Sequence, residues 1–349
     1  MMHIRVLGEG RSAAAAKCLA QAKGYGIARE GEVCDLAILS PGIPLCDERV
    51  LACKRARVPV IGEMEFGLRH LKGKALGVTG TNGKTTTVAL CEYMLKAAGK
   101  RVLACGNNGY ALCQALVDHP DVDIYVIEMS SYQLETASSR ALDAAVVLNV
   151  TPDHLDRYAS FEDYRAAKMR IIDLVKPGGR FECDLSIEKA AEYLTGLDIK
   201  YAKGFQRPAH RLEFIKEARG IKFINDSKGT NVESVLYAVK TLEGPLILLA
   251  GGLAKGGDFT RWLHPFKGRV KQLYVFGQAA DAIEMALRMG FAVEKVNDLK
   301  EATKKAFHKA SVGDTIVLSP GCSSFDQFRD FEHRGDVFKQ CVQEFSDES

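Results

Sequence analysis

Short apolar runs alternate with helical patterns along almost the whole chain of 349 residues. The runs often hold Val, Ile and Leu at successive positions, as parallel strands buried on both faces require. After Lys84, the residues Val88, Cys91 and Leu95 lie at helical spacing before Gly99. This rhythm predicts an α/β protein with mainly parallel sheets. The expected strands are Ile4–Leu7, Leu36–Leu39, Ala75–Val78, Val102–Cys105, Ile124–Glu128, Ala145–Val150, Ile221–Asn225, Leu246–Ala250, Leu273–Phe276 and Thr315–Leu318.

Two breaks in this rhythm suggest domain boundaries. The first is the polar stretch at 71–74, directly before the strand at Ala75, and the second is at 206–208. We therefore expect three domains, at 1–72, 73–208 and 209–349, which suits a chain of this length.

Composition excludes several classes of protein. The formal net charge is only +3 and Lys and Arg are not concentrated in a stripe, which argues against a nucleic-acid partner. No apolar stretch is long enough to insert into a membrane, and the N-terminus lacks the apolar core of a signal peptide. The ten cysteines form no CxxC pair, so zinc and thioredoxin-like sites are disfavoured. We expect a cytoplasmic protein.

A glycine-rich loop follows the predicted strand at Ala75 and precedes a predicted helix. Glycines let backbone N–H groups point at phosphate oxygens, and a helix start favours anions. A lysine here would neutralise phosphate charge, and the next threonine would bind Mg²⁺. Val78 replaces the first glycine of the common pattern, so the loop is a shorter variant, and a plain glycine turn is the alternative. The loop comprises Gly80, Thr81, Asn82, Gly83, Lys84, Thr85 and Thr86.

Polar side chains also stand where two later strands end. Glu128 closes one strand, and Asp153, His154 and Asp156 follow the next. Carboxyl ends of parallel strands meet at one edge of a sheet, where a carboxylate near phosphate suits Mg²⁺. Glu128 could instead cap a helix, and a lone histidine is as often structural as functional. Lys168, taken alone within a helical pattern, is expected to be a solvated surface group.

The last third of the chain carries three more polar loops, each after a predicted strand. They cover Asn225–Asn231, Leu249–Lys255 and Leu318–Phe328. Their position predicts one crevice at the carboxyl edge of a sheet.

Together these segments resemble the Mur ligase family, and within it the D-glutamate-adding members. The resemblance runs in order from about Gly8 to Phe338. Its most specific parts are the segment Asn225–Asn231 and the block from Ser319 to Phe331 with Glu332, Arg334 and Gly335. The phosphate loop is shared by all Mur ligases and by folylpolyglutamate synthetases.

The resemblance implies a three-domain architecture: a small Rossmann-like N-terminal domain, a central P-loop ATPase-like parallel sheet, and a C-terminal Rossmann-like domain. It implies a monomer that uses ATP and Mg²⁺ to join D-glutamate to UDP-N-acetylmuramoyl-L-alanine. ATP would phosphorylate the alanyl carboxylate, and the amine of D-glutamate would displace the phosphate. Such phosphoryl transfer depends on positioning and charge neutralisation.

The resemblance also assigns individual residues. Lys84, His154 and Lys168 would be catalytic, and Lys168 would be carbamylated by CO₂ into an oxygen ligand. Thr85, Glu128, His154 and Lys168 would serve two Mg²⁺ ions. The remaining assignments are Arg211, Asp226 and Lys228 for the nucleotide, Thr230, Lys255, Ser324 and Phe331 for D-glutamate, and Gly10, Arg11, Ser12, Asn107 and Ser130 for the UDP-sugar.

Two departures from the family pattern leave alternatives open. The first domain is short, and the stretch from Lys168 to Arg211 lacks the Gly-x-His-Asn-x-x-Asn motif that approaches adenine in the family. A non-catalytic relative that binds a nucleotide or UDP-sugar would fit that loss, although it would not need the metal-binding set. A folylpolyglutamate synthetase is disfavoured by the block at Ser319–Phe331.

Overall fold

The computed structural model describes residues 1–154, 157–254 and 256–345. By its internal contacts the chain divides into two compact units. Unit 1 comprises 1–150 and 160–205, and unit 2 comprises 151–159 and 206–349. The three-domain boundaries at 72/73 and 208/209 stay predictions.

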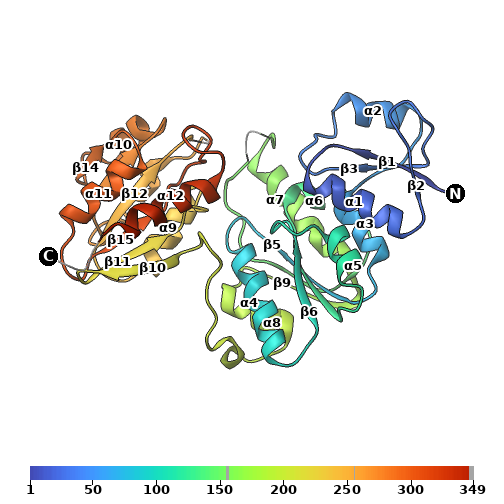
Figure 1. Ribbon diagram of the computed structural model, residues 1–349, viewed down its shortest axis with the longest axis horizontal. Helices are drawn as coiled ribbons and strands as arrows, with labels where there is room; N and C mark the ends of the chain where they lie inside the picture. The colour runs from blue at the N-terminus through green and yellow to red at the C-terminus, as the bar shows by residue number, and fades with distance from the viewer. Residues whose placement is uncertain (155–156, 255, 346–349) are drawn as a thin grey trace. The chain divides into compact units, whose positions relative to one another are not determined.

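Unit 1 contains two fully parallel sheets (Figure 1). The smaller has the strand order β2-β1-β3-β4. It consists of β1 (His3–Leu7), β2 (Gly26–Ile27), β3 (Leu36–Leu39) and β4 (Val60–Gly62), with helices α1 (Arg11–Ala22), α2 (Glu48–Arg55) and α3 (Glu63–His70).

The larger sheet of unit 1 has the order β6-β7-β5-β8-β9. Its strands are β5 (Lys74–Thr79), β6 (Val102–Gly106), β7 (Ile124–Glu128), β8 (Leu142–Val147) and β9 (Val175–Cys183). Its helices are α4 (Lys84–Ala97), α5 (Leu112–Asp118), α6 (Ser131–Leu134), α7 (Phe161–Met169) and α8 (Ile187–Thr195), with 3-10 turns at Arg170–Leu174 and Ile199–Ala202. Helices α4 and α8 pack on one face, and α3, α5 and α6 on the other.

Helices α3 and α5 join the two sheets of unit 1 because they belong to two cores. Leu112 on α5 packs with the larger sheet, while Cys113 beside it packs with α1 and the smaller sheet. Phe66 on α3 also lies in the core of the smaller sheet. The small N-terminal sheet is therefore part of the same compact unit as the phosphate loop.

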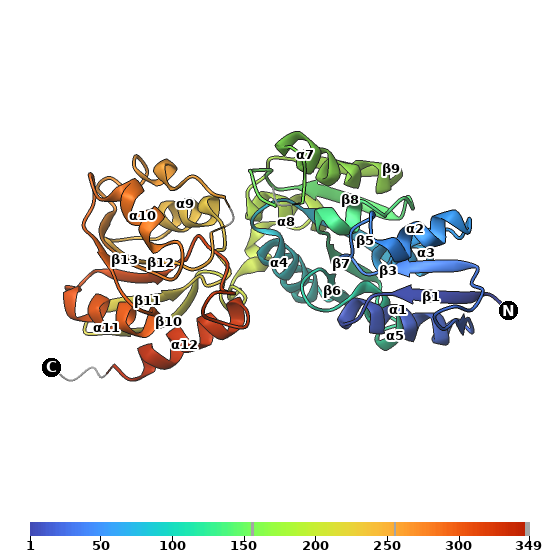
Figure 2. The same ribbon diagram turned by 90° about the horizontal axis from the view of Figure 1, so that it is seen from above.

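Unit 2 is a doubly wound sheet with the order β10-β11-β15-β12-β13-β14. Only the β10–β11 pair is antiparallel. Helices α9 and α10 cover one face, and α11 and α12 cover the other (Figure 2). The elements are β10 (Glu213–Ala218), β11 (Ile221–Asn225), α9 (Val232–Thr241), β12 (Leu246–Gly251), a 3-10 turn (Phe259–Trp262), β13 (Val270–Phe276), α10 (Ala280–Leu287), β14 (Val293–Lys295), α11 (Leu299–Lys309), β15 (Thr315–Leu318) and α12 (Phe331–Gln343).

All ten predicted strands are present, which confirms the α/β fold class with its mainly parallel sheets. The largest shift is in the strand predicted at 145–150, which runs as β8 from Leu142 to Val147. It ends early because Leu148 and Asn149 turn to pack against and hydrogen-bond the phosphate loop. Strands β2, β4, β9, β10 and β14 were not predicted, because they are short or carry Gly, Pro and charged residues.

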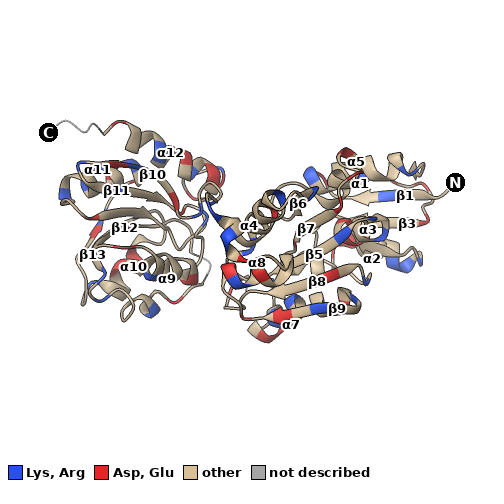
Figure 3. Cartoon of the chain, turned by 90° about the horizontal axis from the view of Figure 1, so that it is seen from below, with Lys and Arg blue, Asp and Glu red and all other residues tan. Residues whose placement is uncertain are grey.

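Acidic and basic residues are interspersed along both units in the view of Figure 3. Among the described residues, no helix is long and apolar enough to cross a membrane.

Candidate active site

The phosphate loop lies between β5 and α4, as predicted. Gly83 is the N-cap of α4 and has a left-handed backbone, with φ 89°. Such a conformation strongly favours glycine. The Asn149 side chain holds the loop, because it accepts from the Asn82 amide at 3.0 Å and donates to the Asn82 carbonyl at 3.0 Å. The loop is thus fixed at the start of a long helix, where an anion is favoured.

Lys84 lies over this loop rather than extending into solvent. Its Nζ donates to the carbonyl oxygens of Gly80 and Thr81, at 2.9 Å in each case. The ammonium group is therefore held where phosphate oxygens cradled by the loop would meet it.

Glu128 and Thr85 form the candidate magnesium site. The Thr85 hydroxyl donates to Oε2 of Glu128 at 2.7 Å, and Nδ2 of Asn107 donates to Oε1 at 3.0 Å. Glu128 is buried at the end of β7. At Gly106, with φ 100°, a Cβ would overlap the Glu128 carbonyl oxygen, so this approach requires glycine. A hydroxyl and a carboxylate oxygen in contact are a donor set that fits Mg²⁺.

Lys168 is buried and contacts the phosphate loop. Its Nζ donates to the Gly80 carbonyl at 2.8 Å and lies 4.6 Å from the centroid of the Tyr164 ring. The Tyr164 hydroxyl is 3.2 Å from Oγ1 of Thr81. The expectation from the helical pattern alone, a solvated surface lysine, is wrong, because α7 packs this face onto the loop. Lys84, Thr85, Glu128 and Lys168 therefore converge on one loop within unit 1.

His154 belongs to unit 2. Its backbone is left-handed, with φ 55°, and its amide donates to Oδ1 of Asp153 at 2.9 Å. Nε2 of His154 lies 3.9 Å from Oδ2 of the same carboxylate. A left-handed backbone is uncommon for a residue other than glycine, so local contacts must hold His154 in place.

The residues predicted to contact the nucleotide in unit 2 cluster around Asp226. This carboxylate is buried, accepts from the Ser319 hydroxyl at 2.8 Å and accepts from the Leu212 amide at 3.2 Å. Burial raises its pKa to about 7, although these hydrogen bonds and the charge of Arg211 oppose the shift. Nζ of Lys228 lies 4.8 Å from the centroid of the Phe331 ring, a cation–π contact.

The raised pKa of Asp226 makes the stability of unit 2 depend on pH. The folded carboxyl binds its proton more tightly than the unfolded one, whose pKa is near 3.8. Its contribution is thus present at low pH and lost as pH rises toward 7. We expect the free energy of unfolding to fall by roughly 2 to 3 kcal/mol more between pH 5 and pH 8 in the wild type than in Asp226→Asn. Chemical unfolding without nucleotide would measure this, and equal pH dependence would contradict it.

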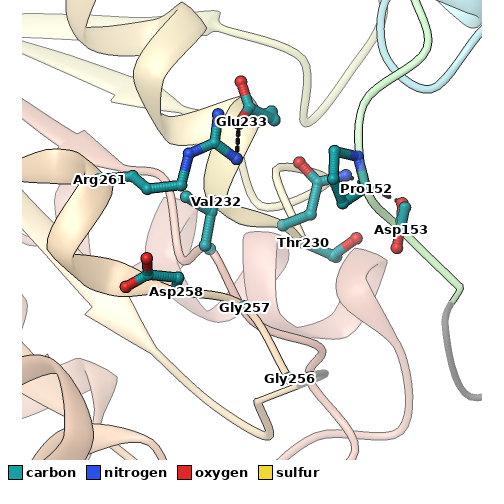
Figure 4. Close-up of a pocket in the computed structure, with 11 residues that line it drawn as sticks. Pro152, Asp153, Thr230, Val232, Glu233, Gly256, Gly257, Asp258 and Arg261 are labelled. Atoms are coloured by element: carbon teal, nitrogen blue, oxygen red, sulfur yellow. Dashed lines mark hydrogen bonds and ion pairs between the residues drawn. The ribbon is translucent and has the colours of Figure 1, made fainter. Parts of the chain in front are cut away.

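Among the described residues predicted to hold D-glutamate, only Thr230 lines a cavity. Thr230 lines a cavity of about 280 Å³ in unit 2, with Asp153, Glu233 and Arg261 (Figure 4). Ser324 is buried after β15, and Phe331 begins α12. Neither of these lines the cavity. Lys255 lies outside the described residues.

The predicted UDP-sugar residues lie in unit 1. Gly10 is the N-cap of α1, directly before Arg11 and Ser12. Nη1 of Arg11 lies 3.2 Å from the position of a Cβ on Gly109, so its guanidinium approaches the loop that carries Asn107. Ser130 caps α6 in a capping box with Gln133.

A second cavity, about 510 Å³ in volume, opens in unit 1 where β1 and β2 end. Its charged lining is mainly basic, with Arg5, Lys17, Arg29 and Arg49 against Glu9 and Glu30. Gly8 lines it, whereas Gly10, Arg11 and Ser12 do not. A cavity with this lining suits a ligand that carries phosphate.

Sequence reasoning assigned no role to Arg334, which organises the loops of unit 2. Its side chain is fully buried. Nε donates to the Ser227 hydroxyl at 3.0 Å, Nη2 to the Ser227 carbonyl at 2.7 Å, and Nη1 to the Cys322 carbonyl at 3.1 Å. Burial lowers its pKa to about 10. The signal in the sequence was that Arg334 is charged but lies among the regularly spaced apolar residues of α12.

A parallel sheet with a phosphate loop and an adjoining hydroxyl–carboxylate pair defines a nucleotide-phosphate-binding protein. The chain matches the family models for the Mur ligase middle domain over residues 78–233, and for the Mur ligase, glutamate ligase domain over 210–322. It is 36% identical over 369 residues to a UDP-N-acetylmuramoylalanine--D-glutamate ligase from Protochlamydia amoebophila, covering 88% of this chain and 83% of the relative. A ligase of the same name from Thermoanaerobacter sp. is 34% identical, with 89% and 84% covered.

A solved structure with the same fold is the MurF ligase from Thermotoga maritima in complex with ADP. It aligns with a TM-score of 0.63 and 17% identity, covering 97% of this chain and 95% of that one. The chain belongs to the Mur ligase family. The resemblance stated from the motifs is thereby confirmed.

Proposed function

We propose that this chain joins D-glutamate to UDP-N-acetylmuramoyl-L-alanine, with ATP converted to ADP and phosphate, in peptidoglycan synthesis. The observation that carries the proposal is the convergence of Lys84, Thr85, Glu128 and Lys168 on one phosphate loop. This occurs in a chain 36% identical to a ligase of that name.

In this reaction a carboxylate oxygen of the alanyl group takes the γ-phosphoryl group of ATP. The amine nitrogen of D-glutamate then bonds to the carbonyl carbon, loses a proton, and phosphate leaves with that carboxylate oxygen. Lys84 would bind the transferring phosphoryl group and stabilise its charge. Thr85 and Glu128 would hold Mg²⁺, which supplies charge neutralisation to the phosphates.

The other assignments are proposals of the same kind. In unit 2, Arg211, Asp226 and Lys228 would contact the nucleotide, His154 would serve a second Mg²⁺, and D-glutamate would be held by Thr230, Lys255, Ser324 and Phe331. In unit 1, Gly10, Arg11 and Ser12 would hold the uridine end beside the basic cavity that Gly8 lines, and Asn107 and Ser130 would approach the pyrophosphate or its sugar. Because its substrates are a nucleotide-linked sugar and ATP, we place the protein in the cytoplasm. By its resemblance to the family, we propose that it acts as a monomer.

Lys168 would act as a carbamate. Its amine nitrogen would bond to the carbon of CO₂ and release a proton. The remaining N–H could still donate to the Gly80 carbonyl, as the amine does now at 2.8 Å. The two new oxygens would then be available to a metal ion, which an ammonium group cannot bind.

The carbamate predicts a specific pattern of rescue. We expect Lys168→Ala to lower the rate of phosphate release about a hundredfold, because an oxygen ligand is lost. Short carboxylic acids such as acetate should restore part of this rate by filling the vacated position. A variant rate that acetate leaves unchanged would count against carbamylation, while the ligase assignment would stand.

A non-catalytic relative that binds a nucleotide or UDP-sugar is the second candidate. One feature favours it: the sequence contains no asparagine from 150 to 224, so the asparagines of the family's adenine motif are missing from that stretch. The intact loop with its hydroxyl–carboxylate pair argues for catalysis instead.

Assays of phosphate release that omit one component at a time distinguish the ligase from the non-catalytic relative. We expect phosphate release only when ATP, Mg²⁺, D-glutamate and the UDP-muramoyl-alanine acceptor are all present. Tight binding of the UDP-sugar with no phosphate release would indicate the non-catalytic relative. Full activity with L-glutamate and no muramoyl acceptor would end the assignment.

A further inference from the structure

The segment 151–159 belongs to a different unit from its neighbours in the sequence. It follows β8 and precedes α7, both of which belong to unit 1. By its own contacts, however, the segment belongs to unit 2. Pro152 and Asp153 form part of the wall of the cavity that Thr230 lines, and in Figure 4 they lie beside Thr230. Some contact in unit 2 must therefore hold this segment there.

Asn231 provides such a contact. It is the N-cap of α9, and its Oδ1 accepts from the Ser234 amide at 2.9 Å and from the Ser234 hydroxyl at 2.8 Å. The cap requires the oxygen on that side, which leaves Nδ2 to point the other way. There Nδ2 donates to Oδ2 of Asp153 at 3.0 Å.

Asp153 connects Asn231 to His154 through its two carboxylate oxygens. While Oδ2 accepts from Asn231, Oδ1 accepts from the backbone amide of His154 at 2.9 Å. That amide belongs to a residue with a left-handed backbone, which costs energy outside glycine. The Asp153 carboxylate is thus a bridge between a helix cap and a strained residue.

We propose that Asn231 is a positioning residue that holds the His154 segment on the amino-acid-binding unit through Asp153. The role given to His154 rests on the proposed function. Asn231 directly follows Thr230. The same short segment would therefore contact D-glutamate through Thr230 and position the candidate metal ligand His154 through Asn231. The helix cap alone would not require Asp153 as a partner.

Exchange of the two side chains tests the proposal. Asn231→Asp keeps the cap, because Asp is as good an N-cap as Asn, but places two carboxylates against each other. The double variant combines Asn231→Asp with Asp153→Asn. In it, the carboxylate introduced at position 231 can cap α9 and accept from the new amide at position 153. The side-chain oxygen at position 153 can still accept from the backbone amide of His154. All the hydrogen bonds are therefore retained, and only the one between positions 153 and 231 changes its direction.

Hydrogen exchange of the ligand-free protein reports on the segment without any activity. We expect Asn231→Asp to make the peptide that contains His154 exchange about tenfold faster. The double variant should return to the wild-type rate. Unchanged exchange in Asn231→Asp would overturn the proposal, as would failure of the double variant to restore slow exchange.

Turnover adds a second readout. We expect kcat to fall about tenfold in Asn231→Asp, with KM for ATP changed much less, because neither the phosphate loop of unit 1 nor the proposed nucleotide contacts of unit 2 are replaced. The double variant should recover most of kcat. If the wild type proves to have no ligase activity, the proposed function fails, whereas the exchange experiment still decides whether Asn231 holds the segment. Normal kcat in Asn231→Asp would overturn the positioning role.

Discussion

Lys84→Ala is expected to lower the rate of phosphate release about a thousandfold, the largest effect of any single replacement considered for catalysis. The Lys84 ammonium is held over the loop by the carbonyl oxygens of Gly80 and Thr81. It is therefore already in place when the phosphoryl group develops charge, and alanine removes that cation. Steady-state assays of phosphate release with all substrates present would measure the loss.

Lys96→Ala is the matched control because Lys96 lies on the same helix, α4. Its side chain is exposed and pairs with Glu92 four residues earlier, at 2.8 Å. Exposed pairs of this kind contribute little, so activity should stay within about twofold of the wild type. A folded Lys84→Ala protein that keeps a tenth or more of wild-type activity would contradict the role of Lys84.

Arg334→Leu is expected to cost about 4 kcal/mol in the free energy of unfolding of unit 2. The guanidinium satisfies the buried carbonyls of Ser227 and Cys322, and leucine can donate to neither. Part of the loss is offset because a buried charge is removed, which the lowered pKa of Arg334 reflects. Thermal unfolding should show a midpoint lower by roughly 10 °C.

Arg329→Leu is the comparison for this effect. Arg329 is exposed and precedes the same helix, α12. Its replacement should change the free energy of unfolding by no more than about 0.5 kcal/mol. Equal midpoints for the two variants, or a stable Arg334→Leu protein, would show that the buried guanidinium does not hold these loops together.

The fold was largely predictable because its strands are buried on both faces. Runs such as Leu36–Leu39 and Leu246–Gly251 are buried at every position, and such runs stand out in a sequence. Strand β9 spans Lys176, Pro177 and two glycines, and three of the six residues of β10 are charged. Their pairing depends on neighbours in the sheet rather than on local composition, so the sequence alone did not reveal them.

The sequence predicted the part of the candidate site that adjoins the phosphate loop. It was less informative where a residue's position depends on how the helices pack. The position of the Gly80–Thr86 loop could be predicted because it is rich in glycine and lies between a predicted strand and a predicted helix. By contrast, the burial of Lys168 depends on how α7 packs on the loop, and its helical pattern alone suggested a surface position. The roles inferred for Asn231 and Arg334 arise from contacts across more than 70 residues of sequence, between 153 and 231 and between 227 and 334.

Isotope transfer tests the central claim most directly. The acceptor would be prepared with ¹⁸O at both oxygens of its alanyl carboxylate and incubated with ATP, Mg²⁺ and D-glutamate. If that carboxylate takes the phosphoryl group and then loses it to the attacking amine, each released phosphate should carry one ¹⁸O atom, as mass spectrometry would show. Amide product formed with unlabelled phosphate would contradict activation of the carboxylate at the Lys84 loop.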